Sequence, residues 1–389
     1  MENESYVRGS SKTRVMKTEV FTSDLKDCLK RMNLIAVKNS SNPIDSKIRG
    51  HVDGNGSTSF LVYNYNDKTE VYKEKIKSGG QTQWVFVVDC SKLSKIIQKA
   101  KSNTIILEKL VSGYLSIIAG NLKTKIPTID ESLFSENKYT IPEPSFIINF
   151  KEWKEIVERC KSSIGDNESR KSLMGLNITH AGNDKVVFTG ADAYRIAEQK
   201  KTVNVINLTG FNGILSGTTL KKTVKLFDDD DITFSFDKDL EKLTMSSDDR
   251  VLTVDLIAAE YPNLSSLLCE SGQPVYIESP ELYDAMDMVQ TIVSEGGKNM
   301  TGKITMIDNS FKIEVQKTEF SDGSVEIPME GINENVIGIN IHFFSDLAAL
   351  FKKTERISIN ISSDQSPILI QSEEFEGFKA VLMPVRINW

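Results

Sequence analysis

The chain has 389 residues, of which 39% are apolar and 26% are charged, a composition typical of a globular protein with two or three domains. It contains no run of 18 or more apolar residues, so the sequence offers no candidate membrane-spanning helix. The formal net charge of −7 by itself argues against a nucleic-acid partner, but the distribution of charge among the predicted elements matters more than its sum.

Residues 1–14 are polar and lack an apolar core, so we expect a flexible tail rather than a secretory signal. The four cysteines, Cys28, Cys90, Cys160 and Cys269, lie far apart, and the three histidines are isolated. Neither a zinc site nor a disulfide framework is therefore expected, and the sequence predicts no metal and no cofactor. Reduced thiols are typical of the cytoplasm, where we expect the protein to reside.

One local pattern occurs three times: an alternating strand leads into a short helix with an apolar stripe. The first apolar residues of these helices are Leu25, Trp153 and Leu282, which are separated by 128 and 129 residues. Ser23 and Ser279 are the predicted N-caps of the first and third of these helices. The spacing predicts three copies of one domain.

A second helix is predicted in each copy, at 91–101, 219–227 and 343–353, with corresponding residues 127 and 124 positions apart. The segments between helices alternate apolar with polar residues and are bounded by Gly, Asn, Asp and Ser, which is typical of short strands. Each copy is thus predicted to be an α+β domain with two helices packed on antiparallel sheets. Three unrelated α+β domains with coincident spacing are the alternative.

Two polar segments, 134–145 and 268–275, are the predicted linkers between the copies. After the tail, the predicted domains are therefore 15–137, 138–270 and 271–389.

The predicted helices are basic, whereas the rest of the chain is acidic. The first helices of the three copies, at 24–33, 151–161 and 280–292, together with the three second helices carry a net charge of +7, which leaves −14 for the remainder. Such a distribution presents one positive surface to phosphates while the protein stays acidic elsewhere. Solvated helix faces without any partner are the alternative.

The helix at 219–227 illustrates the pattern. Leu220, Val224 and Phe227 are predicted to form its buried stripe, and three lysines take the other faces. The helix at 280–292 departs from the pattern because it has no basic residue, so we expect the third domain to contribute less to a phosphate-binding surface.

No glycine-rich nucleotide loop, nucleophile elbow or HExxH motif is present, so no catalytic residues are predicted. The acidic run 228–231 is the one cluster that suggests a metal-dependent nuclease. Four consecutive side chains point in different directions, however, so a solvated turn is the better interpretation. We expect a protein that is not an enzyme, and an adapter that binds proteins without touching DNA stays open.

Five segments resemble, in order, those of the bacterial beta sliding clamp family, the beta subunits of DNA polymerase III. They are the Asn-Pro-Ile loop at 42–44, MGLNI with TGADAYRIA at 174–178 and 189–197, AEYPNLSSLL at 259–268, IGINIHFFSDLAAL at 337–350 and KAVLMPVRI at 379–387. The resemblance covers the chain from about residue 15 to its C-terminus and adds a specific fold to the repeat found above.

The resemblance implies the DNA clamp fold, in which two three-domain chains join head to tail as a homodimer and form a six-domain ring. A ring of this kind is a non-catalytic processivity factor that encircles double-stranded DNA, and sequence-blind phosphate contacts let it slide. Its implied partners are the DNA polymerase catalytic subunit, the clamp loader, and mismatch-repair and other proteins carrying clamp-binding peptides, all in the nucleoid-associated cytoplasm and none at a membrane. A divergent second clamp of this family is the alternative.

Three sets of site residues follow. The residues predicted to face DNA are Lys26, Lys30, Lys38, Asn39, Lys92, Lys95, Lys99, Lys154, Asn167, Arg170, Lys171, Lys221, Lys222 and Lys225. The peptide-binding groove implied by the resemblance comprises Leu173, Tyr194, Arg195, Ile196, Pro262, Leu267, Met300, Asn340, Phe343, Val381, Leu382, Met383, Pro384, Val385 and Arg386. The implied dimer contacts are Leu115 and Ile117, on an edge strand at 113–120 that would meet a strand near 324–330.

Within the groove, the resemblance implies an apolar pocket for a leucine or phenylalanine anchor, formed by Leu173, Ile196, Leu267, Val381 and Met383. Asn340 is expected to orient the peptide, and flexible Met300 and Met383 suit a surface that accepts several partners.

Three departures from the family pattern bear on partner choice. Residues 191–194 read Ala-Asp-Ala-Tyr where the family has Thr-Asp-Gly-His, which is expected to narrow or stiffen the groove mouth. Gly217 and Thr218 replace a basic pair, and Asn388 and Trp389 extend the chain past the usual end.

Overall fold

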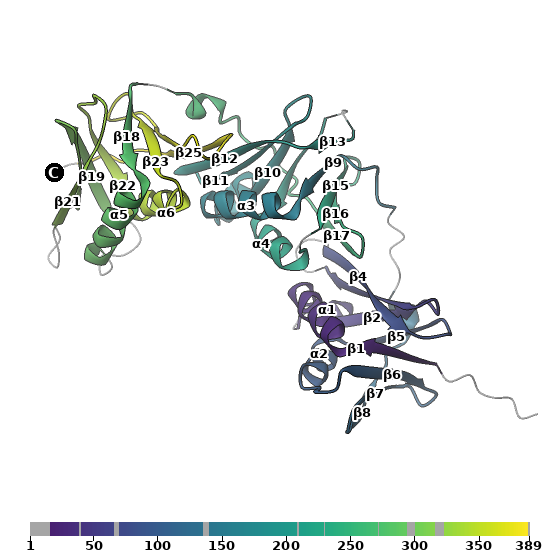
Figure 1. The fold of residues 1–389 in the computed structure, drawn as a ribbon. Coiled ribbons are helices and arrows are strands. Elements are labelled where there is room, and N and C mark those ends of the chain that lie inside the picture. The colour runs from purple at the N-terminus through teal and green to yellow at the C-terminus, as the bar shows by residue number, and fades with distance from the viewer. Residues whose placement is uncertain are drawn as a thin grey trace, which may run out of the picture. The chain divides into compact units, whose positions relative to one another are not determined.

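The computed structural model describes residues 16–38, 40–65, 70–134, 140–207, 210–228, 230–270, 272–293, 300–315 and 323–387. The chain divides into two compact units, which are residues 1–141 with 244–254 and residues 142–243 with 255–389. The α+β class predicted from the sequence is confirmed, because helices and antiparallel strands make up both units (Figure 1).

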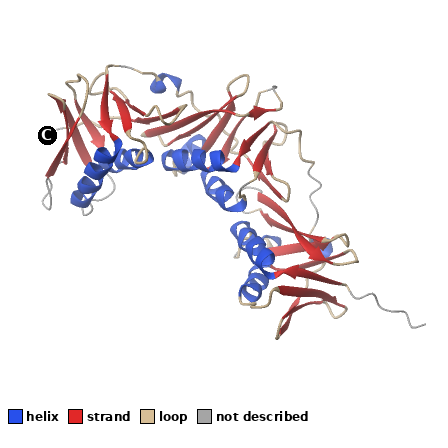
Figure 2. Ribbon diagram, in the orientation of Figure 1, coloured by secondary structure: helices blue, strands red, loops and turns tan. Residues whose placement is uncertain are grey.

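In the first unit, helices α1 (Thr22–Ile35) and α2 (Cys90–Gln98) lie on one side of the strands (Figure 2). Its strands are β1 (Lys17–Phe21), β2 (Lys47–Val52), β3 (Ser57–Asn64), β4 (Glu70–Gly79), β5 (Trp84–Asp89), β6 (Thr104–Leu110), β7 (Tyr114–Ala119) and β8 (Leu122–Pro127), with most of β16 (Lys242–Ser246) and β17 (Arg250–Asp255). Strand β17 pairs with β4, so a segment from far along the chain completes this sheet.

The second unit contains helices α3 (Phe150–Cys160), α4 (Gly217–Leu226), α5 (Ser279–Val293) and α6 (Ile341–Leu350). Its strands are β9 (Phe146–Asn149), β10 (Gly175–His180), β11 (Lys185–Ala191), β12 (Arg195–Thr202), β13 (Asn204–Val205), β14 (Asn212–Ser216), β15 (Asp231–Asp237), β18 (Pro274–Glu278), β19 (Thr301–Ile307), β20 (Ser310–Val315), β21 (Gly323–Pro328), β22 (Val336–Asn340), β23 (Arg356–Asn360), β24 (Ile368–Gln371) and β25 (Phe378–Leu382).

An eight-stranded sheet runs through this unit in the order β14-β10-β11-β12-β25-β24-β23-β18, and a four-stranded sheet has the order β21-β20-β19-β22. The four helices lie along one side of these sheets, which leaves the opposite sheet face for other contacts (Figure 2). The antiparallel pair β12–β25 joins segments far apart in the sequence into one continuous sheet.

The predicted repeat of strand and helix is confirmed. Helices α1, α3 and α5 each begin directly after a strand, namely β1, β9 and β18. Leu25, Trp153 and Leu282 each lie three residues after the helix start and are at most 1% exposed. The same position of each helix is therefore anchored in the core.

The predicted N-caps are wrong, because both serines lie inside the first turn of their helices rather than before it. Ser23 is the second residue of α1, and Ser279 is the first residue of α5. Side-chain oxygens of Asp89, Asn149 and Asn340 instead cap α2, α3 and α6. The strand runs straight into the helix, so the capping residue is the last residue of the strand.

The predicted buried stripe of α4 is partly wrong. Leu220 is buried as expected, but Val224 is half-exposed, and Thr223 is fully buried in its place. The Thr223 hydroxyl accepts a hydrogen bond of 3.0 Å from Trp153 Nε1 on α3. This bond gives both buried polar groups a partner, while Leu220 and Phe227 are buried as predicted.

The predicted edge strand at 113–120 is also wrong. A two-residue turn with Gly120 at φ 59° folds the chain back, so that β8 pairs along β7. Strand β7 therefore lies between β6 and β8, and Leu115 and Ile117 are fully buried in the core. Among the described residues, β8 ends one sheet opposite β13, and β21 ends the four-stranded sheet opposite β22.

Candidate functional site

An apolar cluster spans four neighbouring strands of the eight-stranded sheet. Ile196 on β12 lies opposite Ala191 on β11 and Val381 on β25, and Val381 lies opposite Leu369 on β24. These four residues and Leu268 are at most 7% exposed. They form one buried apolar cluster, and the strand register fixes which of these side chains meet.

Five partly buried side chains pack against this cluster: Leu173, Tyr261, Leu264, Leu267 and Met383. All five residues predicted to form the anchor pocket are thus brought together in one cluster. Sequence reasoning missed Tyr261, although an aromatic residue ahead of the predicted groove proline was a usable signal. Burial raises the pKa of its hydroxyl, which stays protonated and donates to the backbone oxygen of Thr189 at 3.1 Å.

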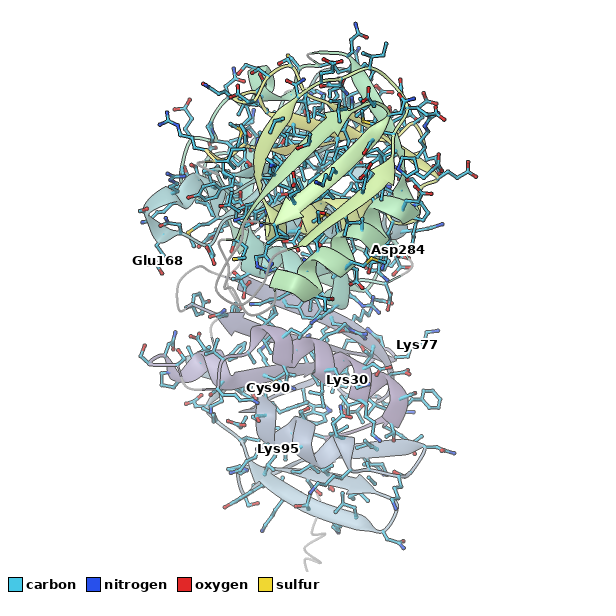
Figure 3. All side chains as sticks on the ribbon, turned by 90° about the vertical axis from the view of Figure 1, so that its left-hand side faces the viewer. Lys30, Lys77, Cys90, Lys95, Glu168 and Asp284 are labelled. Atoms are coloured by element: carbon cyan, nitrogen blue, oxygen red, sulfur yellow. The ribbon has the colours of Figure 1, made fainter. Side chains whose placement is uncertain are left out.

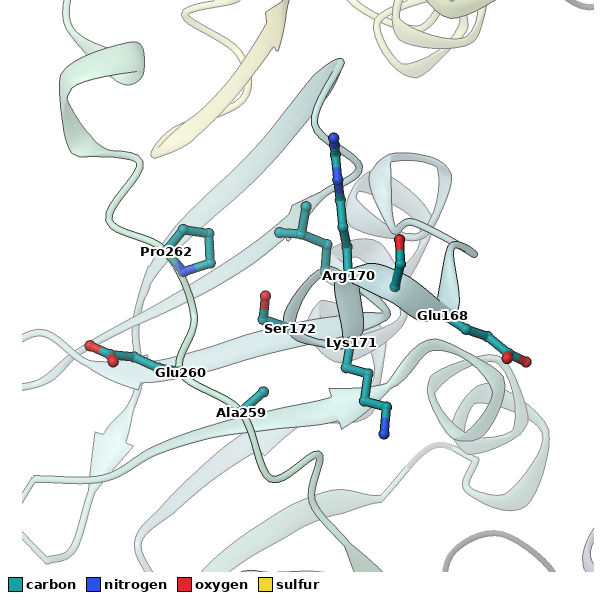
Figure 4. A pocket seen from close by; sticks show the side chains of 9 residues that line it. Glu168, Arg170, Lys171, Ser172, Ala259, Glu260 and Pro262 are labelled. Carbon is teal, nitrogen blue, oxygen red and sulfur yellow. The ribbon is translucent and has the colours of Figure 1, made fainter.

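A cavity of about 580 Å³ adjoins the cluster at Leu173 (Figure 4). Arg170 and Lys171, which were predicted to face DNA, line this cavity together with Leu173 and Pro262, which were predicted to line the groove. Glu260 lies across the cavity from the basic pair. Residues of both predicted sites therefore meet at one place.

Arg195 lies in a polar cluster next to these apolar residues. Its guanidinium pairs with Asp192 at 2.9 Å and with Asp346 at 2.6 Å, and its side chain is 8% exposed. The guanidinium carbon also lies 4.3 Å from the ring centroid of Phe343. These contacts supply the partners that a buried arginine requires.

Two neighbours extend this cluster. Tyr194 is exposed and stacks on Phe343, with ring centroids 5.6 Å apart. Asn340 is buried, and its side-chain oxygen accepts a hydrogen bond from the backbone nitrogen of Phe343 at 3.1 Å. The oxygen predicted to orient a peptide is therefore used to cap α6.

The remaining predicted groove residues divide between core and surface. Met300 and Leu382 are at most 8% exposed, so both belong to the core and not to a flexible wall, contrary to the expectation for Met300. Pro384 and Val385 are half-buried, and Arg386 is exposed. The C-terminal residues 388–389 lie outside the described residues.

The predicted DNA-facing side chains are largely on the surface. In the first unit Lys38, Lys92, Lys95 and Lys99 are exposed, and Figure 3 shows Lys95 on α2 and Lys30 on the neighbouring α1. In the second unit the exposed residues of this set are Lys154, Asn167, Arg170, Lys171, Lys221 and Lys225. Asn39 lies outside the described residues.

Some members of the set have local partners. Lys26 is half-buried and donates to the backbone oxygen of Ala100 at 2.7 Å, and Lys30 pairs with Asp27 at 2.8 Å. Lys222 is half-buried. The Asn167 oxygen caps the short helix at 168–173. The exposed lysines of α2 and α4 are therefore the better candidates for phosphate contacts.

Other kinds of site find no support in the part of the chain described. No described helix combines the length and the apolar character needed to span a bilayer. Nor do three or more His, Cys, Asp or Glu side chains of the described ranges come close enough together to hold a metal ion.

Comparison with known proteins identifies one group throughout. Residues 147–263 match the family model of the DNA polymerase III beta subunit, central domain, and residues 269–386 match that of its C-terminal domain. The beta sliding clamp of Bacillus subtilis (strain 168) is 20% identical over 303 residues, which cover 75% of this chain and 78% of the relative. That of Rickettsia bellii is 21% identical over 318 residues, covering 77% and 82%.

Solved structures agree in fold. The DNA polymerase III beta subunit of Thermotoga maritima superposes with a TM-score of 0.84 at 20% identity, covering 96% of this chain and 100% of that chain. The beta subunit of Streptococcus pyogenes gives a TM-score of 0.87 at 17% identity with the same coverage.

Proposed function

This chain belongs to the family of the DNA polymerase III beta subunit, the beta sliding clamps, and we propose from this membership that it is a DNA polymerase processivity factor that encircles duplex DNA. It holds polymerases on DNA by topology and not by chemistry, so it needs no catalytic residue, metal or cofactor. It acts on the nucleoid in the cytoplasm.

The proposed assembly is a head-to-tail homodimer of three clamp domains per chain, at 15–137, 138–270 and 271–389. The pairing of β8 of one chain with β21 of its partner would close the ring, because both strands have an unpaired edge among the described residues. Leu122, 38% exposed on β8, and Val111, 98% exposed in the turn between β6 and β7, replace Leu115 and Ile117 as the proposed apolar contacts.

The DNA-facing surface consists of helix lysines. Lys92 and Lys95 on α2, Lys99 at its C-cap, and Lys221 and Lys225 on α4 are exposed. Flexible ammonium groups contact phosphates without reading bases, which suits a protein that must slide.

The observation that carries the proposal for partner binding is the apolar cluster around Ile196 and Val381. Leu173, Leu267 and Met383 pack on this cluster and stay partly buried, so they are the apolar side chains available to contact one leucine or phenylalanine of a peptide. The ligands are short segments of the polymerase catalytic subunit, the clamp loader and repair proteins.

Retention on circular DNA tests the ring. The protein is placed on a nicked circular plasmid by the clamp loader, and half of the sample is then linearised by a restriction enzyme. A ring stays on the circle and leaves the linear form through its ends, so gel filtration recovers protein with the circle only. A solution mass close to twice the chain mass of 43.5 kDa supports the homodimer.

Equal retention on both forms would contradict encirclement and would indicate an ordinary basic DNA binder. A monomeric mass together with no retention on either form would favour the protein-binding adapter.

A further inference from the structure

Beside the apolar cluster, the rings of Tyr194 and Phe343 and the Arg195 guanidinium lie against one another. The rings of Tyr194 and Phe343 have centroids 5.6 Å apart and planes inclined by 30°. The Arg195 guanidinium carbon lies 4.3 Å from the Phe343 centroid. Tyr194 is 54% exposed, so the stack ends in a ring that is open to solvent.

Two hydrogen bonds to the Asp192 side chain constrain the backbone at Tyr194 and Arg195. The Asp192 side-chain oxygen accepts hydrogen bonds from the backbone nitrogens of Tyr194 at 2.9 Å and Arg195 at 2.7 Å. Ala193 between them has φ 76°, a conformation rare for any residue with a Cβ. A ring on so constrained a turn loses little freedom when a ligand stacks on it.

Met383 links this stack to the apolar cluster. The backbone nitrogen of Met383 donates to the backbone oxygen of Tyr194 at 2.8 Å, and the Met383 side chain packs on the apolar cluster. A peptide whose aliphatic anchor fills the cluster therefore passes within one or two residues of the Tyr194 ring.

The chemistry of the stack favours a planar apolar group over a polar one. The donors of Arg195 point at two carboxylates, and the Asn340 oxygen caps α6. Phe343 offers no hydrogen-bonding atom and Tyr194 only the hydroxyl at its ring edge, so the ring faces present aromatic surface to a ligand. Paired aromatic rings gain free energy beyond simple burial.

We propose that Tyr194 and Phe343, backed by Arg195, form a stacking platform that selects clamp-binding peptides with an aromatic side chain next to the aliphatic anchor. The proposal rests on the peptide-binding function proposed above. It makes Tyr194 and Phe343 determinants of specificity, while Arg195 positions them.

Matched peptides test the platform. Fluorescein-labelled hexapeptides Gly-Ser-X-Leu-Ser-Gly, with X as Trp, Leu or Gln directly before the leucine anchor, are titrated against the full chain by fluorescence anisotropy. The wild type is expected to bind the Trp peptide about three- to tenfold more tightly than the Leu or Gln peptide, which is the range of one aromatic pair. Tyr194→Phe should keep this preference, whereas Tyr194→Ala and Phe343→Leu should remove it, so that the Trp peptide binds no more tightly than the Leu or Gln peptide.

Leu240→Ala is the matched control, because Leu240 is equally exposed at 54% but lies in the turn between β15 and β16. It should bind all three peptides as the wild type does.

Equal affinity of the wild type for all three peptides would overturn the platform while leaving the groove in place. Tighter binding of every peptide by Tyr194→Ala would also overturn it, because the ring would then be a cover over the pocket. If no peptide binds although the protein is retained on circular DNA, both the platform and the proposed groove are contradicted, but the clamp function stands.

Discussion

Glu198 shows how the position of one residue in the sheet sets its chemistry. It lies on β12 between Thr189 of β11 and Lys379 of β25. Burial raises the pKa of the Glu198 carboxyl, against the opposing effects of a hydrogen bond from the Thr189 hydroxyl and the charges of Lys379 and Lys200. A carboxyl with a raised pKa stabilises the fold most when it is protonated.

Glu198→Gln should therefore change the pH dependence of stability. The wild-type contribution is complete below the unfolded pKa of about 4.3 and is lost as pH rises through the higher folded pKa. Relative to the wild type, the variant should become more stable as pH increases from 4 to 7, measured as the urea midpoint by tryptophan fluorescence. Exposed Glu334→Gln is the control, and a difference between Glu198→Gln and wild type that stays constant with pH would contradict the prediction.

At the scale of elements, the junctions between strands and helices organise both units. Asp89, Asn149 and Asn340 each end a strand and cap the helix that follows. Because no loop intervenes, the cap fixes the helix against the sheet from which it starts. Asn340 has this role at the edge of the candidate groove, where its place in the sequence alone suggested a ligand contact.

Two substitutions separate these roles for Asn340. Asn340→Asp keeps a capping oxygen and adds a charge that the helix N-terminus favours, so stability and binding of the Leu peptide should match the wild type. Asn340→Ala should lower the free energy of unfolding by about 1 kcal/mol. Thermal unfolding and peptide anisotropy check both. Loss of peptide binding by a fully stable Asn340→Asp would show that the amide itself contacts the ligand.

At the scale of the whole molecule, the charge distribution is what makes an acidic protein a DNA-binding candidate. The net charge is −7, yet α2 and its C-cap expose Lys92, Lys95 and Lys99. The same unit also exposes Lys73, Lys75 and Lys77 on β4, which the simple contrast of basic helices with acidic sheets did not anticipate. Two sets of equal charge thus lie on different elements of one unit.

Two triple variants, in which each set of lysines is replaced by glutamine, show which of the two surfaces contacts DNA. Changing Lys92, Lys95 and Lys99 should reduce affinity for a 20-base-pair duplex and lower the slope of log K against log salt by about 2 to 3, because each lost phosphate contact removes about one. The β4 triple variant has the same net charge and should keep the wild-type slope. Equal losses would indicate a general charge effect and contradict a dedicated helix surface.

Local pattern and composition are enough to predict the α+β class, the recurrence near 128 residues, the basic helices and the membership in the clamp family. Apolar periodicity encodes which face of an element is buried, and Leu25, Trp153 and Leu282 are buried at equivalent positions. The five residues that the resemblance implies for an anchor pocket lie in one apolar cluster, and their role in binding stays a prediction.

Contacts between segments far apart in the sequence became visible in the folded structure alone. The register of β12 against β25 places Ile196 beside Val381, and no local pattern encodes that pairing. The return of β8 along β7 buries Leu115, and the bond from Trp153 draws Thr223 into the core. Each strand edge and each buried polar atom needs a hydrogen-bond partner. That partner often lies far away in the sequence, so its identity depends on how the whole chain packs.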